Sequence, residues 1–236
     1  LVDQMISADV DAIVIAPADS KALVPALARA EQAGITIINI DNRLEPSVLE
    51  DYQLNIPFIG PSNREGAEMV GSFAVQALEP GSQIAILEGI PSAFNSIERR
   101  TGFEQAAKKA RMSVVTIQSG DWDQTKAAQV TAGILSQFPE LAAILAANDN
   151  MAIGAASAVG MAAQNKEILI AGFDNIEAIH ELILNGTVIG TVDQFGDKLA
   201  VFGIEYALEA LSQTKKAQED KETPLQLITR EILESD

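Results

Sequence analysis

The sequence predicts an α/β protein built on doubly wound parallel sheets. Short runs of four to six mostly apolar residues alternate with longer amphipathic stretches along nearly the whole chain. Such runs are typical of strands covered on both faces, and repeated strand–helix alternation favours parallel strands with right-handed crossovers. The expected strands are Ala12–Ala16, Ile35–Ile40, Ile84–Leu87, Val114–Gln118, Ala143–Ala146, Ile168–Ala171 and Val188–Val192.

The stretches between these runs repeat with the period of a helix and have suitable ends. Asp19 and Ser20 are N-cap candidates, and Pro25 fits a first helical turn, where a missing N–H costs little. Gly34 fits a left-handed C-cap, and Glu79–Gly81 ends a helix in the same way. The expected helices are Lys21–Ala33, Glu65–Leu78, Ser96–Ala110, Gln124–Phe138, Met151–Ala163 and Phe195–Leu211.

Prolines mark two places where the chain could cross between domains. Pro57 and Pro61 bracket a short strand-like piece, and proline makes such a connection stiff. Pro224 follows the polar run Gln213–Thr223 and precedes a strand-like Leu225–Thr229. The pattern alone leaves both a single domain and two α/β lobes open.

Composition narrows the classes of partner and cofactor. The 236 residues include 16 basic and 33 acidic side chains, and a net charge of −17 disfavours a nucleic-acid partner. The absence of cysteine excludes disulfides, Cys-ligated zinc and thiol catalysis. The only histidine, His180, is expected on a partly exposed helix, so we predict no metal and no cofactor. No secretion leader follows Leu1, and no apolar run approaches the roughly 20 residues needed to span a bilayer.

Motifs for catalysis are not found. The sequence contains no G-x-G-x-x-G, no G-x-x-x-x-G-K-[ST] and no G-x-S-x-G pattern. Asp121 and Asp123 flank Trp122 and could suggest the carboxylate pair of a glycosidase. Their position directly before the expected helix at Gln124–Phe138 favours an N-cap with a solvated neighbour. We therefore predict no catalytic residues and no enzyme.

Polar side chains recur where expected strands end, as Asp41–Arg43, Asp121–Asp123, Asn148-Asp149 and Asp174-Asn175. In open α/β sheets, ligands bind outside these strand ends. The alternative at each position is a helix N-cap worth about 1 kcal/mol. Trp122, the single tryptophan, is harder to explain as a cap, and the sequence leaves both a core position and a ligand platform open for it.

Seven short segments, taken in order, carry a resemblance to a known family. They are Ile37–Asp41, Phe58–Asn63, Glu98–Phe103, Gly120–Asp123, Ala147–Gly154, Ala171–Asp174 and Thr191–Gln194. With these segments the sequence resembles the ribose-binding-protein-like, type I periplasmic binding proteins of ABC importers. It is similar, more distantly, to the effector-binding cores of lac-type transcriptional repressors, which is the alternative function. An upstream signal peptide or lipobox would favour the first and a helix-turn-helix the second.

The resemblance implies a solute-binding protein that captures a monosaccharide or sugar alcohol between two lobes, without catalysis. It implies charged contacts to sugar hydroxyls from Asp41 and Arg99 and an aromatic contact from Trp122. Relatives often carry Arg directly after the Asp matching Asp41, whereas here Asn42 precedes Arg43, so either could face the ligand. The implied ligand-binding residues are Asp41, Asn42, Arg99, Trp122, Asn148, Asp174 and Gln194.

The resemblance also implies the lobes and the partners. One lobe would hold residues 1–61 and 195–223, and the other residues 62–194 and 224–236. A ligand touching both lobes shifts an open–closed equilibrium towards the closed form. Membrane permease subunits of an ABC importer would bind that closed form. The implied location is the periplasm, or an extracytoplasmic lipid-anchored state, and no nucleic acid is involved.

One part of the family pattern has no counterpart here. Family members begin with a β-α-β segment, roughly 30 residues or more, before the helix that matches Leu1–Ser7. Without that segment, the first lobe would expose an unpaired strand edge. We expect a chain of this length to be unstable or oligomeric and to bind sugar weakly.

Overall fold

The protein is described by a computed structural model that covers residues 1–162, 167–212 and 219–235. Unit 1 comprises Leu1–Pro61, Ser92–Asn95 and Phe195–Pro224, and unit 2 comprises Ser62–Pro91, Ser96–Gln194 and Leu225–Asp236. Among the sequence expectations, Ala163 of one helix and residues 213–218 of the polar run lie outside the described residues.

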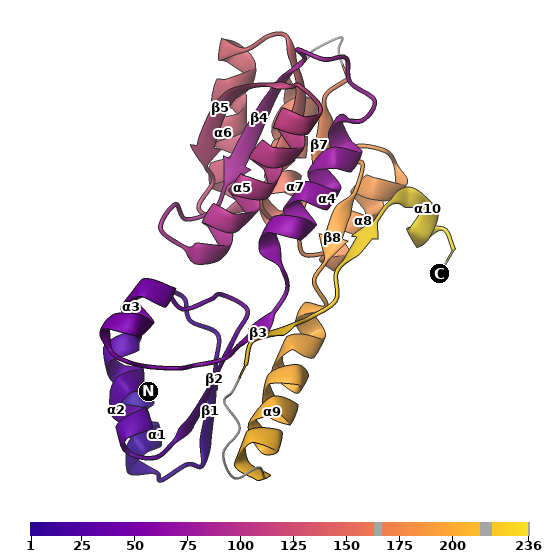
Figure 1. Ribbon diagram of the computed structural model, residues 1–236. Coiled ribbons are helices and arrows are strands. Elements are labelled where there is room, and N and C mark those ends of the chain that lie inside the picture. The colour runs from indigo at the N-terminus through magenta and orange to yellow at the C-terminus, as the bar shows by residue number, and fades with distance from the viewer. Residues whose placement is uncertain (163–166, 213–218, 236) are drawn as a thin grey trace. The chain divides into compact units, whose positions relative to one another are not determined.

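Unit 1 is a parallel sheet with helices on both faces (Figure 1). Its strands β1 (Ala12–Ile15), β2 (Thr36–Ile40), β3 (Phe58–Gly60) and β9 (Lys221–Glu222) lie side by side in that order. The helices are α1 (Val2–Ser7), α2 (Val24–Gln32), α3 (Pro46–Asp51) and α9 (Gly196–Ser212).

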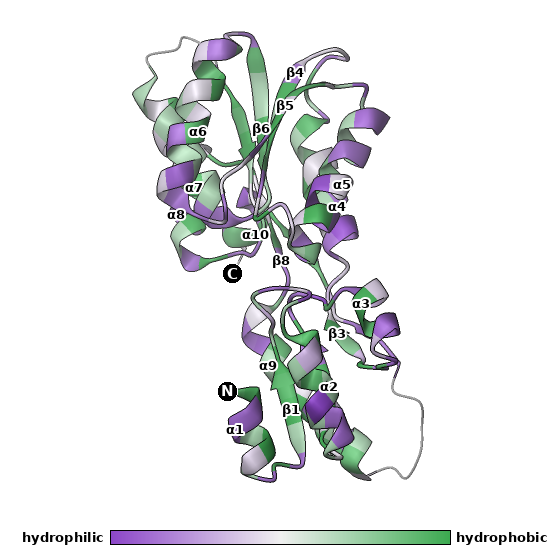
Figure 2. Ribbon diagram, turned by 90° about the vertical axis from the view of Figure 1, so that its left-hand side faces the viewer, coloured by the Kyte–Doolittle hydropathy of each residue, from purple (hydrophilic) through white to green (hydrophobic). Residues whose placement is uncertain are grey.

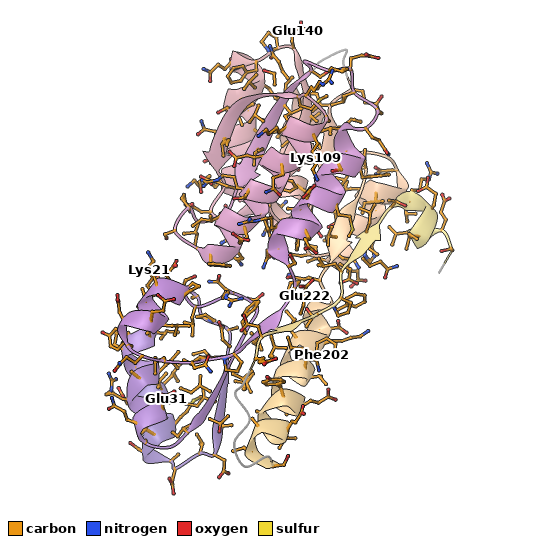
Figure 3. All side chains as sticks on the ribbon, viewed as in Figure 1. Lys21, Glu31, Lys109, Glu140, Phe202 and Glu222 are labelled. Carbon is orange, nitrogen blue, oxygen red and sulfur yellow. The ribbon has the colours of Figure 1, made fainter. Side chains whose placement is uncertain are left out.

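Successive residues of β2 face the two layers of unit 1. Ile37 packs in the cluster formed with α1 and α2, whereas Ile38 and Ile40 pack with α9. Phe202 of α9, labelled in Figure 3, lies against this second cluster. This two-sided burial explains why β2 carries isoleucine on both of its faces, at three of its five positions.

Unit 2 is a second parallel sheet, of strand order β5-β4-β6-β7. Its strands are β4 (Gln83–Glu88), β5 (Ser113–Ser119), β6 (Leu141–Ala146) and β7 (Leu169–Ala171). Figure 2 shows α4 (Asn63–Val75) and α5 (Phe94–Lys109) on one face, and α6 (Gln124–Gln137), α7 (Asp149–Met161) and α8 (Glu177–Leu184) on the other. All six residues of β6 are buried, so this strand is the centre of the core.

Two features of unit 2 depart from the sequence expectation. β5 lies at the sheet edge and is half-buried along most of its length, so the expectation of a strand covered on both faces was wrong for it. In addition, the expected strand Val188–Val192 meets the parallel sheet through a parallel bridge from Gly190 to Ala171, and β8 (Thr191–Asp193) then pairs antiparallel with β10 (Gln226–Ile228). The short helix α10 (Arg230–Leu233) follows β10.

The helix ends follow the expected chemistry in part. The expectation that Asp19 or Ser20 caps α2 was wrong, because α2 begins at Val24 after Leu23 and has no side-chain cap. Asp19 instead accepts the backbone N–H groups of Lys21 and Ala22 at 2.7 Å each in the turn before the helix, and Pro25 lies in the first turn of α2 as expected. Gly34 has φ of +87°, the left-handed conformation that a side chain would disfavour. Across the described ranges, none of the helices is both long and apolar enough to cross a bilayer.

Candidate ligand-binding site

Arg99 of α5 is the centre of a buried polar network in unit 2. Its side chain is 4% exposed. Its Nε donates to Asn63 Oδ1 at 2.7 Å, and its Nη1 donates to the Ala147 carbonyl at 2.8 Å and to Asp174 Oδ1 at 3.0 Å. Its Nη2 donates to Gln194 Oε1 at 3.2 Å. A buried guanidinium needs such partners, because removing its charge from water without them is costly.

Asp174 follows β7 and is the carboxylate of this network. Its Oδ1 accepts from Arg99 and also from Gln194 Nε2 at 2.7 Å, while 23% of the side chain stays exposed. The backbone φ angles of Asp174 and Asn175 are +116° and +58°, in a region that non-glycine residues rarely adopt. The loop therefore needs its surroundings to hold it.

Two aromatic rings flank the Arg99 guanidinium. Its central carbon lies 3.8 Å from the Phe173 ring centroid and 5.7 Å from that of Trp122. Such cation–π contacts add to the fixing of the guanidinium plane. Phe173 is buried, but Trp122 is only partly buried and packs over Gly89, where a Cβ would lie 2.1 Å from the indole. Gly89 thus makes room for the ring.

Asn148 is buried beside Trp122 at the start of α7. Its Oδ1 accepts the Met151 N–H at 3.0 Å, which is the helix-cap role left open by the sequence. Its Nδ2 points to the Trp122 carbonyl at 3.5 Å. A contact of Asn148 to a ligand stays a prediction.

The remaining two predicted residues lie in unit 1, after β2. Asp41 is half-buried with φ of +61°. Asn42 is 4% exposed, and its Nδ2 donates to the Pro17 carbonyl at 3.0 Å. Asn39 supports the turn, because its Nδ2 donates to the Asn42 carbonyl at 2.9 Å and its Oδ1 accepts the Leu44 N–H at 2.8 Å.

Arg43 is used within unit 1. Its guanidinium pairs with Asp220 and lies 5.3 Å from the centroid of the Phe58 ring. Asp220 also accepts the Phe58 N–H at 2.8 Å, which ties β3 to the segment before β9. Of the two residues after Asp41, Arg43 therefore has a structural partner, and Asn42 is held by backbone. The structure thus gathers Arg99, Trp122, Asn148, Asp174 and Gln194 in unit 2, and Asp41 and Asn42 in unit 1.

Comparison with known proteins decides the family. The family model described as periplasmic binding protein domain matches residues 1–216. The chain belongs to the periplasmic binding proteins. It is 45% identical to the D-ribose/D-allose-binding protein of Pseudomonas aeruginosa, over 97% of this chain and 73% of that protein.

Solved structures of periplasmic binding proteins agree with the fold. An ABC transporter solute-binding protein from Burkholderia multivorans is 48% identical with a TM-score of 0.92, over 97% of this chain and 81% of that one. One from Actinobacillus succinogenes with bound D-allose is 33% identical with a TM-score of 0.91, over 100% and 82%. The α/β fold class and the family predicted from the sequence are confirmed.

As a periplasmic binding protein, the chain is a solute-binding protein of the ABC-importer class and not an enzyme. The relatives are sugar-binding import proteins, so the repressor core, the alternative function, is not favoured. The location that goes with the family is the periplasm.

The side chains that suggested other chemistry have structural partners in this periplasmic binding protein. Asp123 caps α6 by accepting the Lys126 N–H at 2.7 Å, and Asp121 pairs with the Lys126 ammonium group. His180 of α8 is half-buried, with Nε2 2.9 Å from Asn175 Oδ1. Within the described ranges, no group of three or more His, Cys, Asp or Glu side chains could hold a metal ion.

Sequence reasoning missed residues that build the network. Asn63 and Phe173 lie in segments that carried the resemblance, but their contacts to Arg99 became visible only in three dimensions. Asp149 was noticed as a strand-end residue and was not assigned to the site. It is buried, and burial first and the nearby Asp174 carboxylate second raise its pKa to about 8.

Proposed function

We propose that this periplasmic binding protein captures a monosaccharide or sugar alcohol and delivers it to the permease subunits of an ABC importer. The observation that carries the proposal is the buried Arg99 guanidinium, held by Asp174 and Gln194 beside the partly exposed Trp122. The relative from Pseudomonas aeruginosa is named for D-ribose and D-allose, and the structure from Actinobacillus succinogenes holds D-allose, which supports the same class of ligand.

The side chains suit the chemistry of a sugar. A sugar presents hydroxyl groups that donate and accept hydrogen bonds, together with an apolar C–H face. The Asp174 carboxylate accepts, the Arg99 guanidinium donates in a planar fork, and Asn148 and Gln194 can do both. The Trp122 ring offers an apolar face to the C–H surface. An analogue that lacks one hydroxyl leaves a buried partner unpaired and therefore loses affinity.

Asp41 and Asn42 would supply contacts from the first lobe, formed by residues 1–61 and 195–223. The other five residues belong to the second lobe, formed by residues 62–194 and 224–236. A sugar bound by both lobes favours the closed form, because only that form makes both sets of contacts. The closed form is then the one recognised by the permease. We place the protein in the periplasm, free or tethered by a lipid anchor.

A thermal-shift screen followed by calorimetry tests the proposal. D-ribose, D-allose and the matching alditols are added at concentrations up to many times the expected Kd. A ligand at about 100 times its Kd stabilises the folded state by about 2.7 kcal/mol, so a true ligand raises the Tm clearly. Failure of every sugar and alditol to shift the Tm would contradict the proposal.

A pair of arginine variants gives the matched control. Arg99→Lys keeps the charge but loses the fork that reaches four acceptors, and we expect at least about a tenfold loss of affinity. Arg64 makes an exposed pair with Glu98 at 2.7 Å in the same unit, and we expect Arg64→Lys to bind like the parent chain. Equal affinities for both variants would remove Arg99 from the site.

A further inference from the structure

Asp149 is a buried carboxyl group outside the predicted set of ligand contacts. It is the first residue of α7 and is 0% exposed. A buried carboxyl group has to be matched by hydrogen bonds, because leaving it unpaired is costly. The hydrogen-bond partners of Asp149 therefore indicate which part of the structure it stabilises.

Those partners lie on two other segments of unit 2. The Asp149 Oδ1 accepts the Thr191 hydroxyl of β8 at 2.7 Å, and its Oδ2 accepts the Ile176 N–H at 3.0 Å. Its own backbone N–H donates to the Phe173 carbonyl at 2.7 Å. The Asp149 carboxyl group also packs directly against Gly172, where any side chain would collide with it, because a Cβ there would lie 2.1 Å from Asp149 Oδ1.

The two hydrogen bonds to the loop bracket its strained residues. Phe173 and Ile176 stand on either side of Asp174 and Asn175, whose positive φ angles are disfavoured for residues with side chains. A loop with such angles persists when its neighbours over-determine it. Asp149 supplies a bond at each end of this loop.

We propose that Asp149 is a positioning residue for ligand binding: by bracketing the loop, it holds the Asp174 carboxylate against Arg99 and Gln194. This inference rests on the proposed role of Asp174 as a contact to the sugar. Asp149 itself is buried behind the loop and acts through Asp174.

The protonation state of Asp149 gives the inference a distinctive readout. Burial, followed by the negative charge of Asp174, raises the pKa of Asp149 to about 8, so the neutral acid predominates at pH 7. The neutral acid accepts from Ile176 with one oxygen and can donate its O–H to the Thr191 oxygen. Ionisation at higher pH places a second negative charge behind the Asp174 carboxylate and weakens its placement.

Other charged groups face the same loop, and their effects on the pH dependence of affinity have to be distinguished from that of Asp149. Asp174 is paired with Arg99, and Asp193 of β8 accepts from Asn175 Nδ2 at 3.1 Å. His180 of α8 contacts the Oδ1 of the same asparagine. The variant His180→Gln removes the imidazole and separates any effect of His180 on affinity from that of Asp149.

The test measures the affinity for D-ribose and D-allose by calorimetry between about pH 7 and 9.5. In the parent chain we expect affinity to fall several-fold over that range. Asp149→Asn mimics the neutral acid, because its amide can donate to Thr191 while its carbonyl accepts from Ile176. We expect it to bind within about twofold of the parent at pH 7 and to lack the alkaline fall. Asp149→Ala should lose about tenfold or more at pH 7.

Glu177→Gln is the matched control. Glu177 is an exposed carboxylate in the first turn of α8, one residue after Ile176, and the variant should follow the parent curve. The inference is overturned if Asp149→Ala only lowers the Tm and leaves the affinity of the folded protein unchanged. It is equally overturned if Asp149→Asn keeps the alkaline fall.

A second readout needs no sugar. The Nη1–H resonance of Arg99, followed by NMR in the unliganded chain, reports whether Asp174 still holds the guanidinium. We expect this resonance to stay in place in Asp149→Asn and to move in Asp149→Ala, and an unmoved resonance in both contradicts the inference. If the parent chain binds neither D-ribose nor D-allose, the proposed binding of these sugars is contradicted. The NMR resonance is then the test of whether Asp149 positions Asp174. If Asp149→Ala does not fold, the pH dependence of the resonance in the parent and Asp149→Asn decides it.

Discussion

The Arg99 guanidinium donates to Asp174 Oδ1 across 3.0 Å while lying 3.8 Å from the Phe173 ring centroid. Asp174 is next to Phe173 in sequence, so one short segment supplies both the counter-charge and the stacking surface. The guanidinium is therefore fixed from two directions before any ligand arrives. Fixing donors in advance reduces the entropy that binding costs.

This pairing predicts the effect of neutralising Asp174. Asp174→Asn keeps the size of the side chain but leaves the buried Arg99 charge with neutral acceptors only. We expect a loss of about 1–3 kcal/mol in the free energy of unfolding and at least about a tenfold loss of sugar affinity. Urea denaturation and calorimetry measure the two quantities. Glu98→Gln removes the partner of the exposed Arg64 and should cost less than about 1 kcal/mol.

Trp122 provides the second prediction. It is the only tryptophan, so the tryptophan emission of the protein, excited selectively over its two tyrosines, reports on this ring alone. We expect the emission to change with bound sugar, and Trp122→Ala to weaken binding by about 1–3 kcal/mol because the C–H face loses its cover. Trp122→Phe should recover part of the affinity. An unchanged Kd in the alanine variant would count against the platform role and favour the core role left open by the sequence.

The raised pKa of Asp149 predicts how stability depends on pH. The pKa of Asp149 is about 8 in the folded state, whereas in the unfolded chain it returns to the ordinary aspartate value of 3.8. Between these values the folded state binds more protons, so this group's contribution is full below about pH 4 and is lost as pH rises through 8. Denaturation at pH 5 to 9 should show the difference between the parent chain and Asp149→Asn changing across this window. A pH-independent difference would mean that Asp149 titrates normally.

Much of the fold could be predicted from the sequence, because single residues indicate where helices begin and end. Pro25 and Gly34 marked the ends of α2, and Asp123 was expected to cap α6 and does so. The two-residue strand β9 and the short helix α3 were not predicted, since segments of that length show no period.

The site was less predictable than the fold. Periodicity placed Asp174 after a strand, but its approach to Arg99 depends on residues 75 positions apart in the chain. The same limit applies to Arg43, whose partner Asp220 is 177 positions away. The family resemblance implied the whole set of ligand-binding residues but did not include Asp149. In the sequence, an acidic residue in the first turn of a helix is explained by its favourable interaction with the helix dipole.

The open edge of unit 1 gives the last prediction. β1 is the first strand of its sheet and pairs only with β2 among the described strands, which leaves backbone groups of an apolar segment unpaired on the other side. On α9, the partly exposed apolar side chains recur at helical spacing, as Val201, Ile204, Leu208 and Leu211, which are 46–61% exposed. A strand edge and an apolar helix stripe on one unit favour association.

We therefore expect a chain of this sequence to self-associate as its concentration rises, measured by sedimentation velocity. Leu208→Gln interrupts the apolar stripe and should shift the equilibrium towards monomer. Glu205→Gln, an exposed position on the same helix, should leave it unchanged. A protein that stays monomeric at every concentration and melts in one sharp two-state transition would contradict this prediction. Burial of the apolar stripe would then contribute too little free energy to offset the entropy lost on association.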